Sequence, residues 1–335
     1  MNQNNKKKVL FYDKQGDNRR SASTMLAAAG CTAEIPWSEA SFISSLKTQQ
    51  YDLLIYPLEY HELVSKITNK STEVPAILLS QAKIKDLGRL FSQHGSANIL
   101  AKNKDGTISS NSLITTINKI FRQNIFGVEH YLPHGTRSEI YHVRDSRERS
   151  EYLDTIKEYC SSLHIRRSVI QAVELFCEEL LMNAIYDAPR DENGEGRFSS
   201  RSRREHVQLK PQQAARMEFA CDGEKLVVSV SDPFGAITWQ TIHSYLQRCF
   251  SEDRKITNLS QNGGAGLGLY MSFLATNSFI VNVQPGERSE FIGIFNLTVR
   301  PQDKRSQYAS LHFFSTESEK PKQTPTPSKK SKLIS

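Results

Sequence analysis

The sequence predicts an α/β protein built from two successive domains, on two observations. In the first 120 or so residues, short apolar runs alternate with mixed segments long enough for helices, which is typical of a buried parallel sheet. The four runs are 9–12, 53–56, 76–79 and 98–101. The later part combines segments of helical periodicity with alternating, strand-like segments. A chain of 335 residues is long enough for two hydrophobic cores.

The apolar runs and their spacers place the first domain at residues 1–121. A connector follows at 122–137, where Gly127, Pro133 and Gly135 interrupt regular structure. We therefore expect the second domain to occupy residues 138–300.

The second domain begins with a strand candidate at 139–143. Helical spacing predicts four helices, at 150–163, 168–188, 239–250 and 267–276. Alternation predicts a hairpin over 215–232 that turns at Asp222-Gly223. Two further strands, at 279–283 and 291–299, are expected to close the sheet around Pro285-Gly286. Two polar segments are expected to lack regular structure: a flexible, arginine-rich insertion at 190–213 and a disordered tail at 301–335.

Composition and charge exclude several classes of protein. No run of 18 apolar residues exists and no signal-peptide core follows the N-terminus, so we expect a cytoplasmic protein without membrane contact. The five cysteines show no paired spacing, which argues against a disulfide framework or a zinc site. The net charge of +7 comes largely from local polar segments, and no recognition helix accompanies it, so nucleic-acid binding is not indicated.

A glycine-rich stretch, 263–269, opens into a predicted helix, and such turns hold phosphate because helical N–H groups point at the anion. Upstream, Glu179 and Asn183 are four residues apart on one predicted helix and share a face. There the Asn183 amide oxygen can ligate Mg2+, and the Glu179 carboxylate can orient or deprotonate an attacking group. No Lys-Ser/Thr pair follows the glycines and no strand directly precedes them, so neither a Walker loop nor a dinucleotide fingerprint is present. Together the two motifs predict an ATP site.

Residues 139–299 resemble the ATP-binding domain of the GHKL superfamily, which is shared by histidine kinases and gyrase-type ATPases. Three motifs carry the resemblance: Glu179-Leu-Leu-Met-Asn183-Ala, Val228-Ser-Val-Ser-Asp232-Pro-Phe-Gly235, and Gly264-Ala-Gly266-Leu267-Gly268-Leu. The likeness is greatest to anti-sigma factor serine kinases. It implies an α/β sandwich in which a mixed sheet carries helices on one face.

The same resemblance implies a role for each motif. Glu179 would be the general base, Asn183 the Mg2+ ligand, and Asp232, followed by Gly235, the acceptor for the adenine amino group. The phosphate cradle would be formed by Gly264, Gly266, Leu267 and Gly268, and residues 236–262 would be a mobile lid. Asp187 stands where the superfamily usually has a basic or imidazole side chain, and its carboxylate could either strengthen Mg2+ binding or weaken ATP binding.

The first domain resembles the receiver domain of response regulators, a doubly wound parallel sheet. Asp13, Ser80 and Lys102 match the receiver pattern, but Pro57 stands in place of the phosphoacceptor aspartate and Lys14 in place of a second acidic residue. The carboxylate cluster that metal-assisted phosphorylation needs is therefore broken. We expect a protein-docking or dimerising module, and an unrelated flavodoxin-like domain is the alternative.

These resemblances imply a bacterial signalling protein that binds Mg-ATP. Its expected activity is that of a protein serine/threonine kinase or an anti-sigma-like regulator, with an anti-sigma antagonist, a sigma factor or another regulator as partner. The alternative is a non-catalytic, ATP-dependent switch or scaffold in a two-component-type pathway. A third reading, a remnant of a hybrid histidine kinase, lacks support from His130, His134 and His142, because none has the context of a phosphoacceptor.

Overall fold

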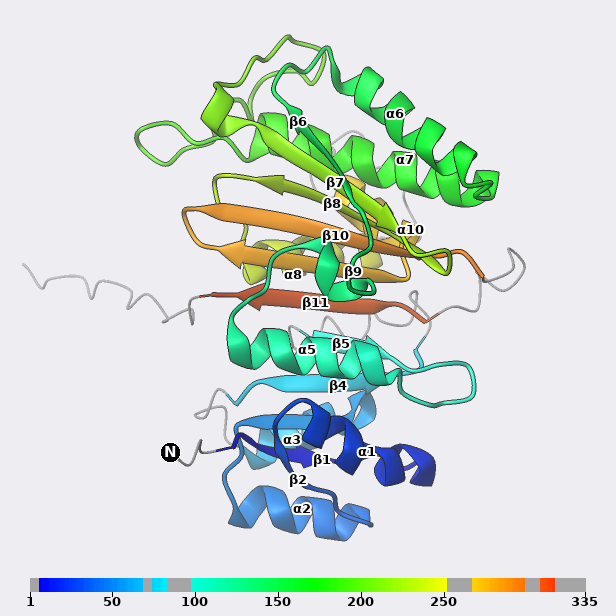
Figure 1. Ribbon diagram of the computed structural model, residues 1–335. Helices are drawn as coiled ribbons and strands as arrows, with labels where there is room; N and C mark the ends of the chain where they lie inside the picture. The colour runs from blue at the N-terminus through cyan, green and yellow to red at the C-terminus, as the bar shows by residue number, and fades with distance from the viewer. Residues whose placement is uncertain (1–5, 69–73, 83–97, 252–266, 299–307, 317–335) are drawn as a thin grey trace, which may run out of the picture.

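The computed structural model describes residues 6–68, 74–82, 98–251, 267–298 and 308–316. Over these residues the protein is a mixed α/β structure organised around one continuous sheet (Figure 1). The sheet has eleven strands within the described ranges, in the order β2-β1-β3-β4-β5-β11-β9-β10-β8-β7-β6. Within the same ranges, no helix has the length and hydropathy of a membrane span.

The first five strands in this order are all parallel, and four of them coincide with the predicted apolar runs. They are β1 (Lys8–Phe11), β2 (Thr32–Glu34), β3 (Leu53–Pro57), β4 (Ala76–Ser80) and β5 (Asn98–Ala101). The prediction of a parallel sheet is confirmed, whereas β2 was missed because it is short and polar.

Helices cover both faces of this parallel part. Side chains of α1 (Gly16–Ala28) and α5 (Ser110–Arg122) pack on one face, and those of α2 (Glu39–Thr48) and α3 (His61–Ile67) pack on the other. Successive residues of a strand point to opposite faces, so β1 contributes Val9 to one core and Leu10 to the other.

The remaining part of the sheet is largely antiparallel. Its strands are β6 (Glu139–Val143), β7 (Ala215–Cys221), β8 (Lys225–Asp232), β9 (Ser278–Gln284) and β10 (Arg288–Asn296). Strands β7 and β8 form the predicted hairpin, and β9 and β10 form a second one. Both hairpins therefore confirm the strands expected from the sequence.

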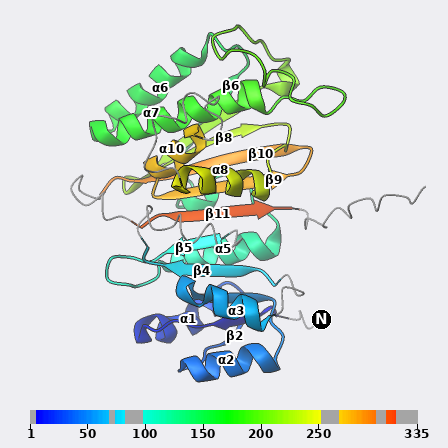
Figure 2. The ribbon, with the colours of Figure 1, turned by 180° about the vertical axis from the view of Figure 1, so that it is seen from behind.

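The helices that pack on this second part share one face of the sheet. They are α6 (Arg149–Ser162), α7 (Arg167–Met182), α8 (Trp239–Ser251) and α10 (Leu267–Ala275). Figure 2 shows α8 and α10 on the side of the sheet that also carries α3. The connector, with its short 3-10 helix η2 (Val128–Tyr131), packs on the opposite face.

Strand β11 (Ser310–Ser315) corrects the prediction of a disordered tail at 301–335. It lies in the middle of the sheet, antiparallel to β5 and parallel to β9. Leu311 packs into the core on the helical face and Phe314 into the core beneath the connector. Burial on both faces outweighs the polar composition of the surrounding segment, so the prediction is wrong for these residues.

The arginine-rich insertion, 190–213, also differs from the flexible segment that its composition predicts. Val207 and Leu209 are buried in the main core. The Tyr186 hydroxyl donates to the carbonyl oxygen of Glu205 at 2.6 Å, and His206 lies 3.0 Å from Asp145. These buried side chains and polar contacts therefore fix the position of an insertion whose composition is largely polar and charged.

Candidate functional site

A cavity of about 540 Å³ lies on the helical face, between α7, α10 and the end of β8. Pockets of this volume are of the usual size for small-molecule ligands. Five of the predicted site residues line it: Glu179, Asn183, Asp187, Asp232 and Gly268. They come from three separate stretches of the chain, so the fold brings the predicted motifs together around one space.

The helix α7 and the turn that follows it place three of these residues. Val173, Phe176 and Leu180 bury one side of α7 in the core, which leaves Glu179 at the edge of the cavity. The helix then widens into a π-helical turn, Asn183–Asp187, in which the Ala188 N–H donates to the Asn183 carbonyl oxygen at 2.8 Å. Such π-helical turns are frequent at functional sites.

The side chains of Glu179, Asn183 and Asp187 surround one guanidinium group, that of Arg203 in the insertion. Arg203 Nη1 lies 3.6 Å from Glu179 Oε2, and Arg203 Nη2 lies 3.1 Å from Asp187 Oδ2. Arg203 Nη2 also donates to Asn183 Oδ1 at 3.4 Å. Sequence reasoning missed Arg203, because a contact twenty residues away in an apparently solvated segment leaves no local pattern.

Burial raises the pKa of two carboxyl groups of the cavity, those of Asp187 and Asp232. Desolvation raises the pKa of Asp187, and Arg203 opposes this rise. Desolvation also raises the pKa of Asp232 to about 6, against hydrogen bonds from the Phe234 and Gly235 N–H groups and the Ser289 hydroxyl. Acidic groups with a raised pKa are common at binding sites, and Asp232 is the more deeply buried of the two.

Asp232 ends β8 with its side chain buried, and its Oδ1 accepts a hydrogen bond from the Phe234 N–H at 3.0 Å. Gly235 follows with φ of +57°, and a Cβ there would overlap the Gln284 carbonyl oxygen. Gly235 therefore shapes the turn behind Asp232, and it does not itself line the cavity.

The start of α10 closes the cavity on another side. A Cβ on Gly268 would overlap the Glu179 carboxylate, so a larger residue at this position would displace that side chain. Leu267 is the first residue of α10 and does not line the cavity. The predicted cradle residues Gly264 and Gly266 lie outside the described residues, as does the lid segment from 252 to 262.

Coordination of a divalent cation at this site would need oxygens from a bound ligand as well as from the protein. Within the described ranges, no group of three or more His, Cys, Asp or Glu side chains is arranged to hold a metal ion. Mg2+ commonly binds through one or two protein oxygens together with phosphate oxygens and water. Asn183 Oδ1 and the neighbouring carboxylates fit that mode, which requires a phosphate-bearing ligand.

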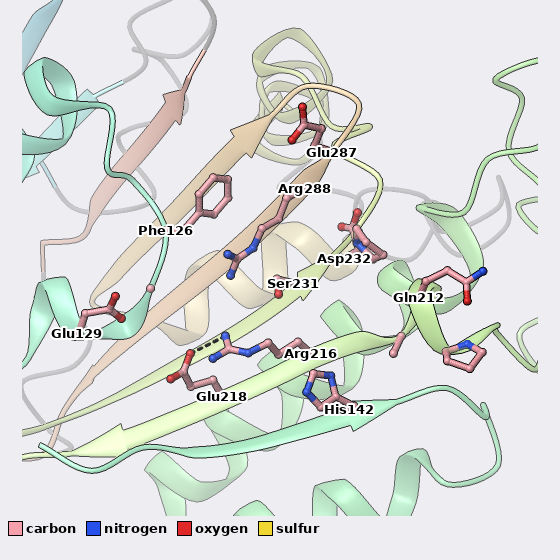
Figure 3. A pocket seen from close by; sticks show the side chains of 14 residues that line it. Phe126, Glu129, His142, Gln212, Arg216, Glu218, Ser231, Asp232, Glu287 and Arg288 are labelled. Atoms are coloured by element: carbon pink, nitrogen blue, oxygen red, sulfur yellow. Dashed lines mark ion pairs between the residues drawn. The ribbon is translucent and has the colours of Figure 1, made fainter.

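A second cavity, of about 420 Å³, lies on the opposite face of the sheet, beside the connector (Figure 3). Both arginines of its lining pair with a carboxylate on their own strand: Arg216 with Glu218 at 2.6 Å, and Arg288 with Glu290, which lies outside the lining, at 3.1 Å. Asp232 lines this cavity as well as the first. The end of β8 therefore borders a cavity on each face of the sheet.

In the first half, two of the three residues that match the receiver pattern, Asp13 and Lys102, form an ion pair. Asp13 is buried, and its Oδ1 lies 2.8 Å from Lys102 Nζ, while Asn18 donates to its Oδ2 at 2.6 Å. Pro57 ends β3 in a buried position, and Lys14 pairs with Glu59 at 3.3 Å. The lysine that could hold a phosphate is thus paired with a carboxylate of its own domain.

A scan against models of protein families finds no match to this chain, and a search of curated proteins finds none.

Proposed function

We propose that this chain is a bacterial signal-transduction protein whose second part, residues 138–300, binds Mg-ATP as a GHKL-type domain. It acts on a protein partner as a serine/threonine kinase or as an anti-sigma-like regulator. One observation carries the proposal: Glu179 and Asn183 of one motif and Asp232 of a second motif line a single cavity of suitable size. Two unrelated polar motifs, about 50 positions apart in the chain, would not be expected to meet in this way.

Each residue has a chemical role in the proposed site. Buried Asp232 would accept a hydrogen bond from the adenine amino group, and Asn183 Oδ1 would ligate Mg2+. Bound Mg-ATP would supply the γ-phosphoryl group. Glu179 would take the proton from a serine or threonine hydroxyl of the partner, and the N–H groups at the start of α10 would stabilise charge on the phosphates.

A receiver-like role for the first part is supported by its strand order. The order 2-1-3-4-5 is that of flavodoxin-like doubly wound domains, a group that includes receivers. With Pro57 in place of an acceptor and Lys102 paired with Asp13, this part serves as a docking or dimerising module and not as a phosphoacceptor.

A non-catalytic, ATP-dependent switch is the second candidate, and the contacts of Arg203 favour it. The Glu179 carboxylate lies 3.6 Å from the Arg203 guanidinium group, so in this arrangement an arginine occupies the position beside the carboxylate that a partner hydroxyl would need. In this reading, nucleotide binding changes the surface offered to a partner, and no phosphoryl group is transferred.

Phosphoryl transfer separates the two candidates. The protein is incubated with γ-labelled Mg-ATP and an extract that contains its partners, and acid-stable label on other proteins is measured. A kinase labels a partner at serine or threonine, whereas a switch labels nothing. Acid-labile label on the chain itself would instead indicate the histidine-kinase reading.

The Glu179→Gln variant tests the role of the carboxylate in this assay. It is expected to abolish transfer and to preserve Mg-ATP binding, because the amide keeps the shape and cannot accept a proton. Glu178→Gln is the matched control, because Glu178 pairs with Arg149 at 2.9 Å and does not line the cavity. Transfer at the wild-type rate by Glu179→Gln would show that the base is wrongly assigned.

A further inference from the structure

The insertion 190–213 brings three cationic side chains to the cavity: Arg190, Arg201 and Arg203. The hydroxyl-bearing Ser199 lines the cavity beside them. Among the described residues, every arginine that lines the cavity comes from this insertion, because α7, β8 and α10 contribute none. One polar segment therefore supplies the positive charge of the cavity.

The contacts of the insertion hold these arginines in place. Phe198 is largely buried, and the guanidinium groups of Arg197 and Arg201 lie 5.2 Å and 5.1 Å from the centre of its ring. Buried Val207 and Leu209 secure the chain on the far side of Arg203. The position of the arginines is thus a product of packing on both sides.

The cavity needs this charge if a nucleoside triphosphate is to enter. Its lining includes the carboxyl groups of Glu179, Asp187 and Asp232, which repel an anionic ligand. The π-helical turn adds Tyr186 and Asp187 and no cation of its own. An anion can bind here only if positive charge comes from outside α7.

Arg203 is placed to provide that charge. It contacts Glu179, Asn183 and Asp187, the same side chains that would face Mg2+ and the phosphates. Its side chain is 42% exposed, so the guanidinium has room to exchange carboxylate oxygens for phosphate oxygens. Arginine suits such an exchange because its planar fork binds carboxylates and phosphates in the same bidentate way.

We infer that the insertion 190–213 supplies the cationic phosphate contacts of this site, beside the N–H groups at the start of α10, with Arg203 as its principal contact and Arg190 and Arg201 in support. The ligand class is a polyphosphate, and within the proposed function, on which this inference rests, it is the triphosphate of ATP. Arg203 leaves Glu179 and Asn183 when the phosphates enter, which frees Asn183 for Mg2+ and Glu179 for the partner hydroxyl.

Calorimetry with three probes tests the inference: Mg-ATP, inorganic tripolyphosphate with Mg2+, and adenosine. For Arg203→Ala, we expect affinity for Mg-ATP and tripolyphosphate to fall roughly 10- to 100-fold, as for loss of a charge-assisted hydrogen bond. Adenosine affinity is expected to stay unchanged, and Arg203→Lys to recover part of the loss. Arg204→Ala is the matched control, because Arg204 is exposed and does not line the cavity.

The outcomes separate this inference from the proposed function. Wild-type affinity for Mg-ATP in Arg203→Ala, tighter binding, or an equal loss for adenosine would overturn the role of Arg203 and leave the nucleotide site standing. Tighter binding in particular would make Arg203 a plug that competes with the ligand. A wild-type protein that binds neither Mg-ATP nor adenosine would overturn the proposed function, and this inference with it.

Discussion

At the scale of single residues, Asp232 shows how burial and binding interact. Burial raises the pKa of this carboxyl group to about 6, above its usual value of 3.8. Because the folded state holds the proton more tightly than the unfolded state, protonated Asp232 favours folding fully below pH 3.8. This contribution is lost as the pH rises through about 6. A ligand that needs the ionised carboxylate as an acceptor therefore binds best above that value.

We expect Mg-ATP affinity to fall roughly tenfold between pH 7 and pH 5, because only about a tenth of Asp232 is ionised one unit below its pKa. Calorimetry at pH 5, 6 and 7 checks this. Asp232→Asn, which cannot titrate, should bind weakly at every pH and lose the dependence. An unchanged wild-type affinity across this range would show that Asp232 does not contact the base.

Gly235 makes a separate prediction, about stability. Gly235→Ala should lower the free energy of unfolding by about 2–5 kcal/mol, because it combines positive φ with overlap against the Gln284 carbonyl oxygen. Gly223→Ala is the control, because Gly223 also has positive φ but an added Cβ there would meet no other atom within 4 Å. It should cost only about 1–2 kcal/mol. If urea denaturation gave the same loss in free energy of unfolding for both variants, the turn behind Asp232 would accommodate the added Cβ without strain.

At the scale of elements, a buried polar cluster links α5, the connector and the sheet. Lys119 of α5 donates to the Tyr131 hydroxyl at 2.8 Å and to Asn282 Oδ1 at 3.0 Å. Glu290 of β10 accepts from the Asn282 amide at 2.8 Å and from the Gly127 N–H at 3.0 Å. Hydrogen bonds of this kind specify how the elements meet, because an unpaired group would be costly to bury.

The cluster also makes stability depend on pH. Desolvation lowers the pKa of Lys119 from 10.5 to about 7, so between these values the unfolded chain binds more protons than the folded one. The free energy of unfolding should therefore rise with pH in this window, by about 2 kcal/mol between pH 7 and pH 9. Lys119→Met should remove this part of the rise. Identical pH profiles for the two proteins would contradict the assignment.

Comparison of sequence and structure shows which elements could be predicted. In strands such as β8 and helices such as α7, the spacing of apolar residues within the element itself indicates the secondary structure, so the local sequence is sufficient to predict them. The short strand β2 and the strand β11 depend on neighbours distant in the chain, so local composition misled. The same holds for the site: Glu179 and Asp232 belong to recognisable motifs, whereas Arg203 reaches the cavity only through tertiary packing.

At the scale of the whole molecule, β11 makes one sheet of two parts. It pairs with β5 of the parallel part on one side and with β9 of the second part on the other. Without it, both neighbours would present unpaired edges, which promote aggregation. A C-terminal segment thus determines how the first part of the chain is joined to the nucleotide-binding part proposed here.

Truncation tests this role of β11. A chain that ends at residue 307 should unfold at a lower temperature than the full chain and should aggregate, as followed by calorimetric scanning and light scattering. A chain that ends at residue 316 keeps β11 and is the control, with an expected transition like that of the full chain. If both truncations behave alike, β11 is not what joins the two parts.

Calorimetric titration of the wild-type protein and Asn183→Ala with ATP, each with and without Mg2+, tests the proposed nucleotide site most directly. We expect saturable binding to the wild type with Mg2+ and a loss of roughly tenfold or more in Asn183→Ala, with a smaller difference when Mg2+ is absent. Asn193→Ala, in an exposed position away from the cavity, should match the wild type. Absence of ATP binding by the wild type with Mg2+ would contradict the proposed nucleotide site.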